Sequence, residues 1–123
     1  MSNRTKGQVE ADISMAMTKF EKEHLGRGPK TVRTYIIEDM ILIRLIGVLT
    51  PAEQKLSTEF DGAQIVKQTR RRLIESSRSI IENIIEDTTG AKVQTLHTDI
   101  SSRTGERIFV LGMDRDLENE FKK

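Results

Sequence analysis

The sequence predicts an α+β fold with the element order α-β-β-α-β-β: a two-layer sandwich whose mostly antiparallel four-stranded sheet carries helices on one face. Two amphipathic stretches have the 3.6-residue spacing of helices, and each is followed by a pair of segments rich in β-branched and aliphatic residues. Hairpins that alternate with helices are typical of an antiparallel sheet covered on one side. A chain of 123 residues fits a single domain, which we expect at residues 8–112. Residues 1–7 should form a disordered tail and residues 113–123 a charged tail or short helix.

The first half should contain one helix and one hairpin. A helix is expected from Gln8 to about Leu25, because apolar residues recur on one helical face at Val9, Ile13, Ala16 and Phe20. Gly26 suits the left-handed position that ends many helices. The Val-, Ile- and Leu-rich stretch that follows predicts two strands, 31–37 and 40–49, with a turn at Glu38-Asp39.

Strand 40–49 is apolar on both of its faces. Alternation places Ile41, Ile43, Leu45 and Leu49 on one face, while the other holds Met40, Leu42, Arg44, Ile46 and Val48. A strand of this kind is usually covered on both sides, and one small domain offers few helices for the second side. We therefore expect a homodimer whose interface contains the second set of residues.

The second half should repeat the pattern of helices followed by a hairpin. Thr50-Pro51-Ala52-Glu53 has the residues of a helix start, with a capping threonine, a first-turn proline and a capping-box glutamate. Asp61-Gly62 should interrupt this short helix, and a long helix should then run to about Asp87 and end at Gly90. Two further strands, 92–100 and 106–112, are joined by the polar turn Ser101–Gly105.

Composition excludes several functional classes. The chain has no cysteine and only two histidines, which excludes thiolate chemistry, iron–sulfur clusters and a three-histidine metal site within one chain. Twenty basic residues balance 19 acidic ones, so the basic excess of a nucleic-acid surface is absent. The longest apolar stretch, residues 40–49, is too short to cross a bilayer and contains Arg44. We expect no transmembrane segment, no signal peptide, no cofactor, no resident metal and no nucleic-acid partner.

Two groups of residues could bind a ligand. Arg27 and Lys30 lie in the glycine-flanked segment after the first helix and could hold an anion, although a tight turn with solvated charges is the alternative. His97 and Asp99 are two apart on a strand and so share a face, which Arg44 joins if its hairpin presents the same face. This cluster could bind a small ligand, or it could satisfy its own hydrogen bonds at a dimer seam.

The stretch Lys67–Arg72 is basic but does not predict nucleic-acid binding. Glu75 lies four residues after Arg71, and Glu82 lies four residues after Arg78, so each arginine has an acidic neighbour on the helix surface. We interpret the stretch as a solvated, ion-paired helix face. No nucleophile elbow, dinucleotide fingerprint or spaced carboxylate pair is present, so we expect no catalytic residue.

Several motifs together resemble one family. These are the helix Glu10–Phe20, Leu25-Gly-Arg-Gly-Pro29, Ile43-Arg44-Leu45 with Gly47–Thr50 and Glu53, Arg70–Leu73, and Leu96-His-Thr-Asp-Ile-Ser101 with Gly105-Glu-Arg107. With them, residues 8 to 112 resemble the MpsC-like family of small bacterial proteins, the YbcI type, formerly a domain of unknown function. The resemblance implies an association with a Na+-translocating, membrane-potential-generating system linked to inorganic-carbon uptake. It supplies no active site.

From these observations we expect a non-enzymatic, cytoplasmic accessory or regulatory protein, held at the inner face of the membrane through a protein partner of that system. The alternative is a small-ligand or anion-binding protein, or a minor enzyme, that uses Arg27, Lys30, Arg44, His97 and Asp99.

Overall fold

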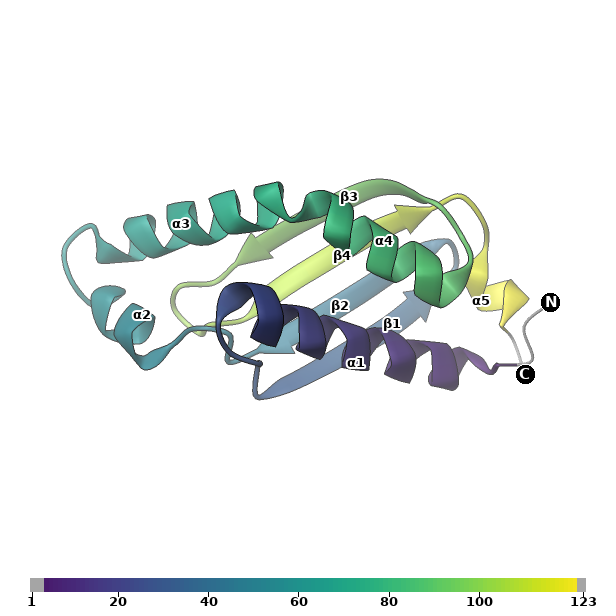
Figure 1. The fold of residues 1–123 in the computed structure, drawn as a ribbon, viewed down its shortest axis with the longest axis horizontal. Coiled ribbons are helices and arrows are strands. Elements are labelled where there is room, and N and C mark those ends of the chain that lie inside the picture. Colours follow the sequence, from purple (N-terminus) through teal and green to yellow (C-terminus); the bar gives the residue numbers. More distant parts are fainter. Residues whose placement is uncertain (1–3, 122–123) are drawn as a thin grey trace.

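The computed structural model describes residues 4–121 and shows two layers, with helices packed on one face of a four-stranded sheet (Figure 1). This is the predicted α+β sandwich. The elements, in chain order, are α1 (Lys6–Leu25), β1 (Thr31–Ile37), β2 (Met40–Ile46), α2 (Pro51–Leu56), α3 (Gly62–Ser76), α4 (Arg78–Thr89), β3 (Val93–Ile100), β4 (Arg107–Met113) and α5 (Leu117–Glu120). Within this part of the chain, no helix has both the length and the apolar composition needed to span a bilayer.

The sheet has the order β1-β2-β4-β3, and every neighbouring pair is antiparallel. Each half of the chain therefore supplies helix, strand, strand, and the second strands of the two halves, β2 and β4, meet at the centre. This order is that of two α-β-β units related by an approximate two-fold rotation. The ends of the described chain also meet, since the backbone N–H of Lys6 donates to the carbonyl of Phe121 at 3.0 Å.

The core lies between the sheet and the helices. Strand alternation sends every second residue of β2 and β4 into it, including Ile43 and Phe109, which are fully buried. Helix α1 contributes Val9, Ile13, Met17 and Phe20 from the face that the periodicity predicted. None of the described helices lies over the opposite face of the sheet (Figure 1).

Helix α1 begins at Lys6, two residues before the expected start. Thr5 accepts a hydrogen bond from the N–H of Gln8, and the Gln8 side chain accepts one from the N–H of Thr5, which makes a complete capping box. Residues 4–7, expected within the disordered tail, are therefore placed here, whereas residues 1–3 of that tail lie outside the described residues. Gly26 ends the helix with φ 95°, as predicted.

Strand β2 ends at Ile46, three residues earlier than expected. Gly47 has φ 74°, outside the strand region, so the alternation stops there. Val48 and Leu49 both turn into the core, and Val48 is fully buried. The prediction that Val48 lies on the second face of the strand, at an interface, is therefore wrong.

The predicted long helix is two helices, because the helical backbone is interrupted at Ser77. This residue has φ −105° and ψ 7°, and it joins α3 to α4. The starts and stops predicted around it are confirmed: Thr50 and Glu53 form a capping box, the chain turns at Asp61, and Gly90 ends α4 with φ 76°.

Candidate functional site

The five predicted ligand residues do not form one site. Arg27 is half-buried and donates a 3.3 Å hydrogen bond to the carbonyl of Leu49, which ties the loop after α1 to the start of α2. Lys30 is exposed, and its backbone N–H donates to Ile46 at 2.8 Å. Both residues lie at the end of the hairpin β1–β2 and have structural contacts there.

Arg44, His97 and Asp99 do share the uncovered face of the sheet, but they are not in contact. Strand β4 lies between β2 and β3, so Arg44 and Asp99 are about two strand spacings, or roughly 10 Å, apart. Arg44 instead donates two hydrogen bonds to Glu106, at 2.7 and 2.9 Å. Asp99 forms an ion pair with Lys67 at 3.6 Å. Among residues 4–121, no group of three or more His, Asp or Glu side chains is placed to hold a metal ion.

The side of the sheet that no described helix covers, which we call the open face, is mostly apolar, but Arg44 lies on its central strand β2 and further charged residues lie on both edge strands. Tyr35 and Ile37 of β1 are 37% and 42% exposed, and Leu42 of β2 is half-buried beside Val110 of β4. Arg33 lies on the edge strand β1, and Asp99 lies on the opposite edge strand β3. The remaining apolar members of the open face are Met40, Ile46 and Ile108.

A charged cluster lies on the other side of the sheet, inside the core. Arg70 of α3 is 2% exposed and donates two hydrogen bonds to Glu53, at 2.6 and 2.9 Å, and one to the carbonyl of Val48 at 2.9 Å. Its third nitrogen lies 3.8 Å from the carboxylate of Glu21, which is fully buried on α1. Arg70 therefore joins three helices and the segment after β2 through a single guanidinium.

Burial shifts the pKa of the charged groups around Arg70. Burial raises the pKa of Glu21 to about 7, against the opposing pull of Arg70 and Arg107. Burial likewise lowers the pKa of Arg107, on β4, to about 10, so its guanidinium stays charged at neutral pH. For Glu53, burial acts to raise the pKa, but the hydrogen bonds from Arg70 and Thr50 outweigh it and hold the pKa below its usual value.

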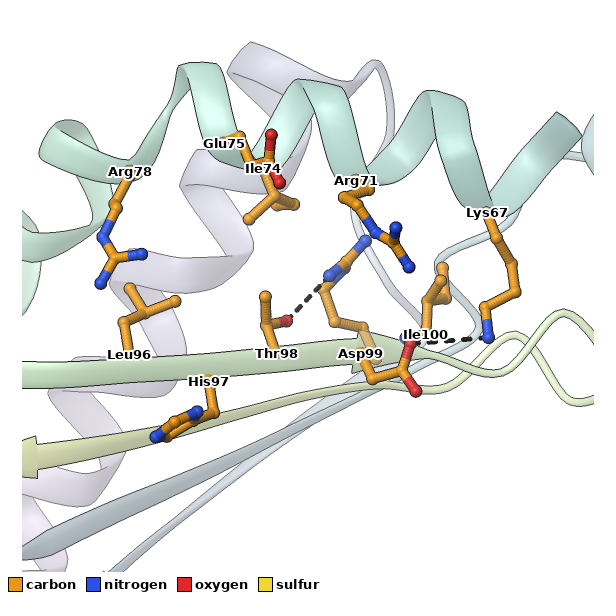
Figure 2. A pocket seen from close by; sticks show the side chains of 11 residues that line it. Lys67, Arg71, Ile74, Glu75, Arg78, Leu96, His97, Thr98, Asp99 and Ile100 are labelled. Atoms are coloured by element: carbon orange, nitrogen blue, oxygen red, sulfur yellow. Dashed lines mark hydrogen bonds and ion pairs between the residues drawn. The ribbon is translucent and has the colours of Figure 1, made fainter. Parts of the chain in front are cut away.

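A pocket of about 310 Å³ lies between α3 and β3 (Figure 2). Its lining combines residues of α3 with residues of β3 and β4: Lys67, Arg71, Ile74, Glu75, Arg78, Leu96, His97, Thr98, Asp99, Ile100 and Arg107. Figure 2 shows Arg71 and Lys67 extending from α3 toward β3, whereas His97 points away from the helix. His97 and Asp99, predicted as ligand residues, thus belong to the rim of this pocket.

Sequence reasoning missed Arg70, Arg107 and Glu21. The sequence predicts that Arg70 belongs to a solvated helix face, but Arg70 is buried. The predicted ion pair between Arg71 and Glu75 does not form within the described chain. The spacing of the apolar residues along the helix could have indicated that Arg70 is buried. Arg70 lies four residues from Val66 and from Ile74, both buried, so it belongs to the apolar stripe of α3.

Comparison with known proteins identifies the family. The family described as "Na+-translocating membrane potential-generating system (MpsC)" matches residues 5–115. The chain is 45% identical over 120 residues to "Uncharacterized protein YbcI" of Bacillus subtilis (strain 168), covering 98% of this chain and 97% of that protein. It is 30% identical over 104 residues to "Uncharacterized protein YrhF" of the same strain, covering 83% and 84%. No solved structure matches it. Because these matches extend over nearly all of the sequence and agree with the motifs, the chain belongs to the MpsC family.

Proposed function

We propose that this chain is a non-enzymatic accessory or regulatory component of a Na+-translocating membrane potential-generating system, and that it acts there as a homodimer in the cytoplasm. Membership of the MpsC family supports the association with such a system. The observation that carries the dimer is the open face of the sheet, over which none of the helices within residues 4–121 lies (Figure 1).

The open face has the composition of a contact surface. A strand face that stays in water usually carries polar residues, but the open face of the central strands β2 and β4 is aliphatic except at Arg44 and Gly112. A contiguous apolar patch with a polar rim on a small protein typically marks an interaction site. Two such faces pack as the two sheets of a β-sandwich do, about 10 Å apart and with their strands offset by roughly 30°.

Charge favours a second copy of the chain as the occupant. One row of the open face runs from Arg33 through Arg44 and Ile108 to Asp99, so it is basic at one edge and acidic at the other. A two-fold axis along the strands, between β2 and β4, places β1 of one protomer over β3 of its partner. Arg33 then lies over the partner's Asp99, and Leu42 lies over the partner's Val110. The face is complementary to itself, as an isologous dimer requires.

A charge swap tests this arrangement. The wild-type chain should be a dimer by light scattering at micromolar concentration. Arg33→Glu and Asp99→Arg should each weaken the dimer, because each places like charges opposite one another, and the double variant should restore it. A strict wild-type monomer would contradict the dimer. Loss of the dimer in all three variants would contradict this two-fold register.

A matched pair of leucine variants separates loss of the dimer from loss of the fold. Leu42→Asp places a charge at the centre of the open face, whereas Leu73→Asp makes the same change on α3, where the leucine is 39% exposed. Only Leu42→Asp should give a folded monomer, with helix and strand content unchanged by circular dichroism.

The role in the system is tested in cells that carry the gene. Deletion should lower the membrane potential that the cells maintain when Na+ is the coupling ion, and the wild-type gene should restore it. The monomeric Leu42→Asp variant should not restore it, whereas Leu73→Asp should. A Na+-dependent potential unchanged by deletion would refute the association.

A further inference from the structure

We propose that the pocket between α3 and β3 binds a small oxyanion, a phosphoryl or carboxylate group held between Arg71 and Arg107. The site lies between α3 and the sheet, and its two arginines take no part in the proposed dimer. None of the residues first expected to bind an anion supplies its central contacts.

Arg107 is the first part of the argument. Its side chain is 2% exposed, and it lines the pocket. One terminal nitrogen donates to the hydroxyl oxygen of Thr98 at 2.8 Å, but Nε and the other terminal nitrogen have no hydrogen-bond partner among the described residues. A buried charged donor without an acceptor is costly, and Arg107 lines the pocket, so an anion seated there would lie against this charged, planar group.

The second part is the charge balance of the pocket. Four cationic side chains line it, against the two carboxylates of Glu75 and Asp99. Lys67 forms an ion pair with Asp99 at 3.6 Å, and Arg78 forms one with Glu82 at 3.1 Å. Within residues 4–121, Arg71 and Arg107 form no ion pair, although the buried Glu21 favours the charge of Arg107, so these two arginines are the cations left to bind an anion. Figure 2 shows that Arg71 reaches from α3 into the space above Thr98, the residue to which Arg107 donates.

The third part is size. A volume of about 310 Å³ is at the lower end for a ligand pocket, so the ligand is small. The side chains of Ile74, from α3, and Leu96, from β3, provide apolar wall. Two guanidinium groups match the geometry of a phosphoryl or carboxylate group better than that of chloride, because each can donate two parallel hydrogen bonds.

The experiment measures the binding of inorganic phosphate and, separately, of malonate. Each anion is tested by thermal unfolding and by calorimetric titration, and chloride at the same ionic strength is the reference. Arg71→Gln removes one half of the site. Arg72→Gln is the matched control, because Arg72 is the adjacent exposed arginine and does not line the pocket. At least one of the two anions should raise the midpoint of unfolding of the wild type and of Arg72→Gln. Arg71→Gln should weaken the binding of that anion by at least about tenfold, which is the loss expected for a charge-assisted hydrogen bond.

Each result of these binding measurements either identifies the class of ligand or contradicts the proposal. Protection by phosphate alone assigns a phosphoryl ligand, and protection by malonate alone assigns a carboxylate. Protection by neither anion overturns the proposal, and so does an equal loss of binding in the Arg71 and Arg72 variants, because that result indicates nonspecific attraction to a basic helix. Arg107→Lys adds a second check, since it keeps the charge but loses the planar fork. It should also weaken binding in protein that remains folded by circular dichroism.

Discussion

Replacing Arg70 with methionine tests whether the buried charged cluster holds the helices on the sheet. Methionine keeps much of the length and apolar volume of the side chain but removes the guanidinium. The variant loses three hydrogen bonds at once, two to Glu53 and one to the carbonyl of Val48. It also leaves the carboxylate of Glu21, fully buried and 3.8 Å away, without its nearest cation.

The expected loss in the free energy of unfolding is about 3–5 kcal/mol, the cost of removing one partner from a buried ion pair. A loss of this size is a large fraction of the total stability of a small domain. Arg72→Met is the matched control, because Arg72 is exposed on the same helix and its replacement should change stability by no more than about 0.5 kcal/mol.

The assay is urea unfolding followed by circular dichroism, with both variants measured at pH 5 and at pH 8. The loss in Arg70→Met should be larger at pH 8. At pH 5 Glu21 is protonated in the folded chain, so the charge of Arg70 contributes little there. At pH 8 Arg70 favours the ionised Glu21 of the wild type by lowering its pKa, and the variant loses this contribution. A loss below about 1 kcal/mol, or one that is independent of pH, would refute this account of the cluster.

Two more predictions concern the core. Because the pKa of Glu21 rises from 4.5 to about 7 on folding, its contribution to stability is full below pH 4.5 and is lost as the pH rises to 7. At about 1.4 kcal/mol per pH unit, the free energy of unfolding falls by about 3 kcal/mol over this range. Glu21→Gln should remove that part of the pH dependence when unfolding by urea is measured. An identical pH dependence in the variant would contradict the pKa assigned to Glu21. Gly62→Ala should destabilise the fold by at least about 2 kcal/mol, since its Cβ would lie 1.7 Å from the carbonyl oxygen of Leu56. Gly7→Ala, whose Cβ meets nothing closer than 4.0 Å, is the control for Gly62→Ala in thermal unfolding and should cost nothing.

Local signals predicted most of the fold. The capping residues around Thr50, the left-handed glycines at Gly26 and Gly90, and the turn at Glu38 act through neighbouring backbone groups, so the sequence alone reveals them. The break at Ser77 was not visible, because apolar periodicity continues on both sides of it and no proline or glycine is present there.

The candidate sites were harder to predict, because they depend on which elements become neighbours. The alternation of β2 correctly separated Ile43 from Leu42, but it gave no warning that the strand would end at Gly47 and bury Val48. Arginine is normally exposed, so charge alone placed Arg70 in solvent. Only the packing of α3 on the sheet brings it close to Arg107, whose pKa it lowers, and to Glu21.

The two ends of the described chain meet beside α5, where the backbone N–H of Lys6 donates to the carbonyl of Phe121. Phe60, 95% exposed, lies in the loop between α2 and α3. A circular permutant with its ends linked and its chain opened beside Phe60 would begin with α3 and α4 and finish with β2 and α2. Its order would again be helix, strand, strand, repeated twice, so the halves would exchange places without any new crossing of the sheet.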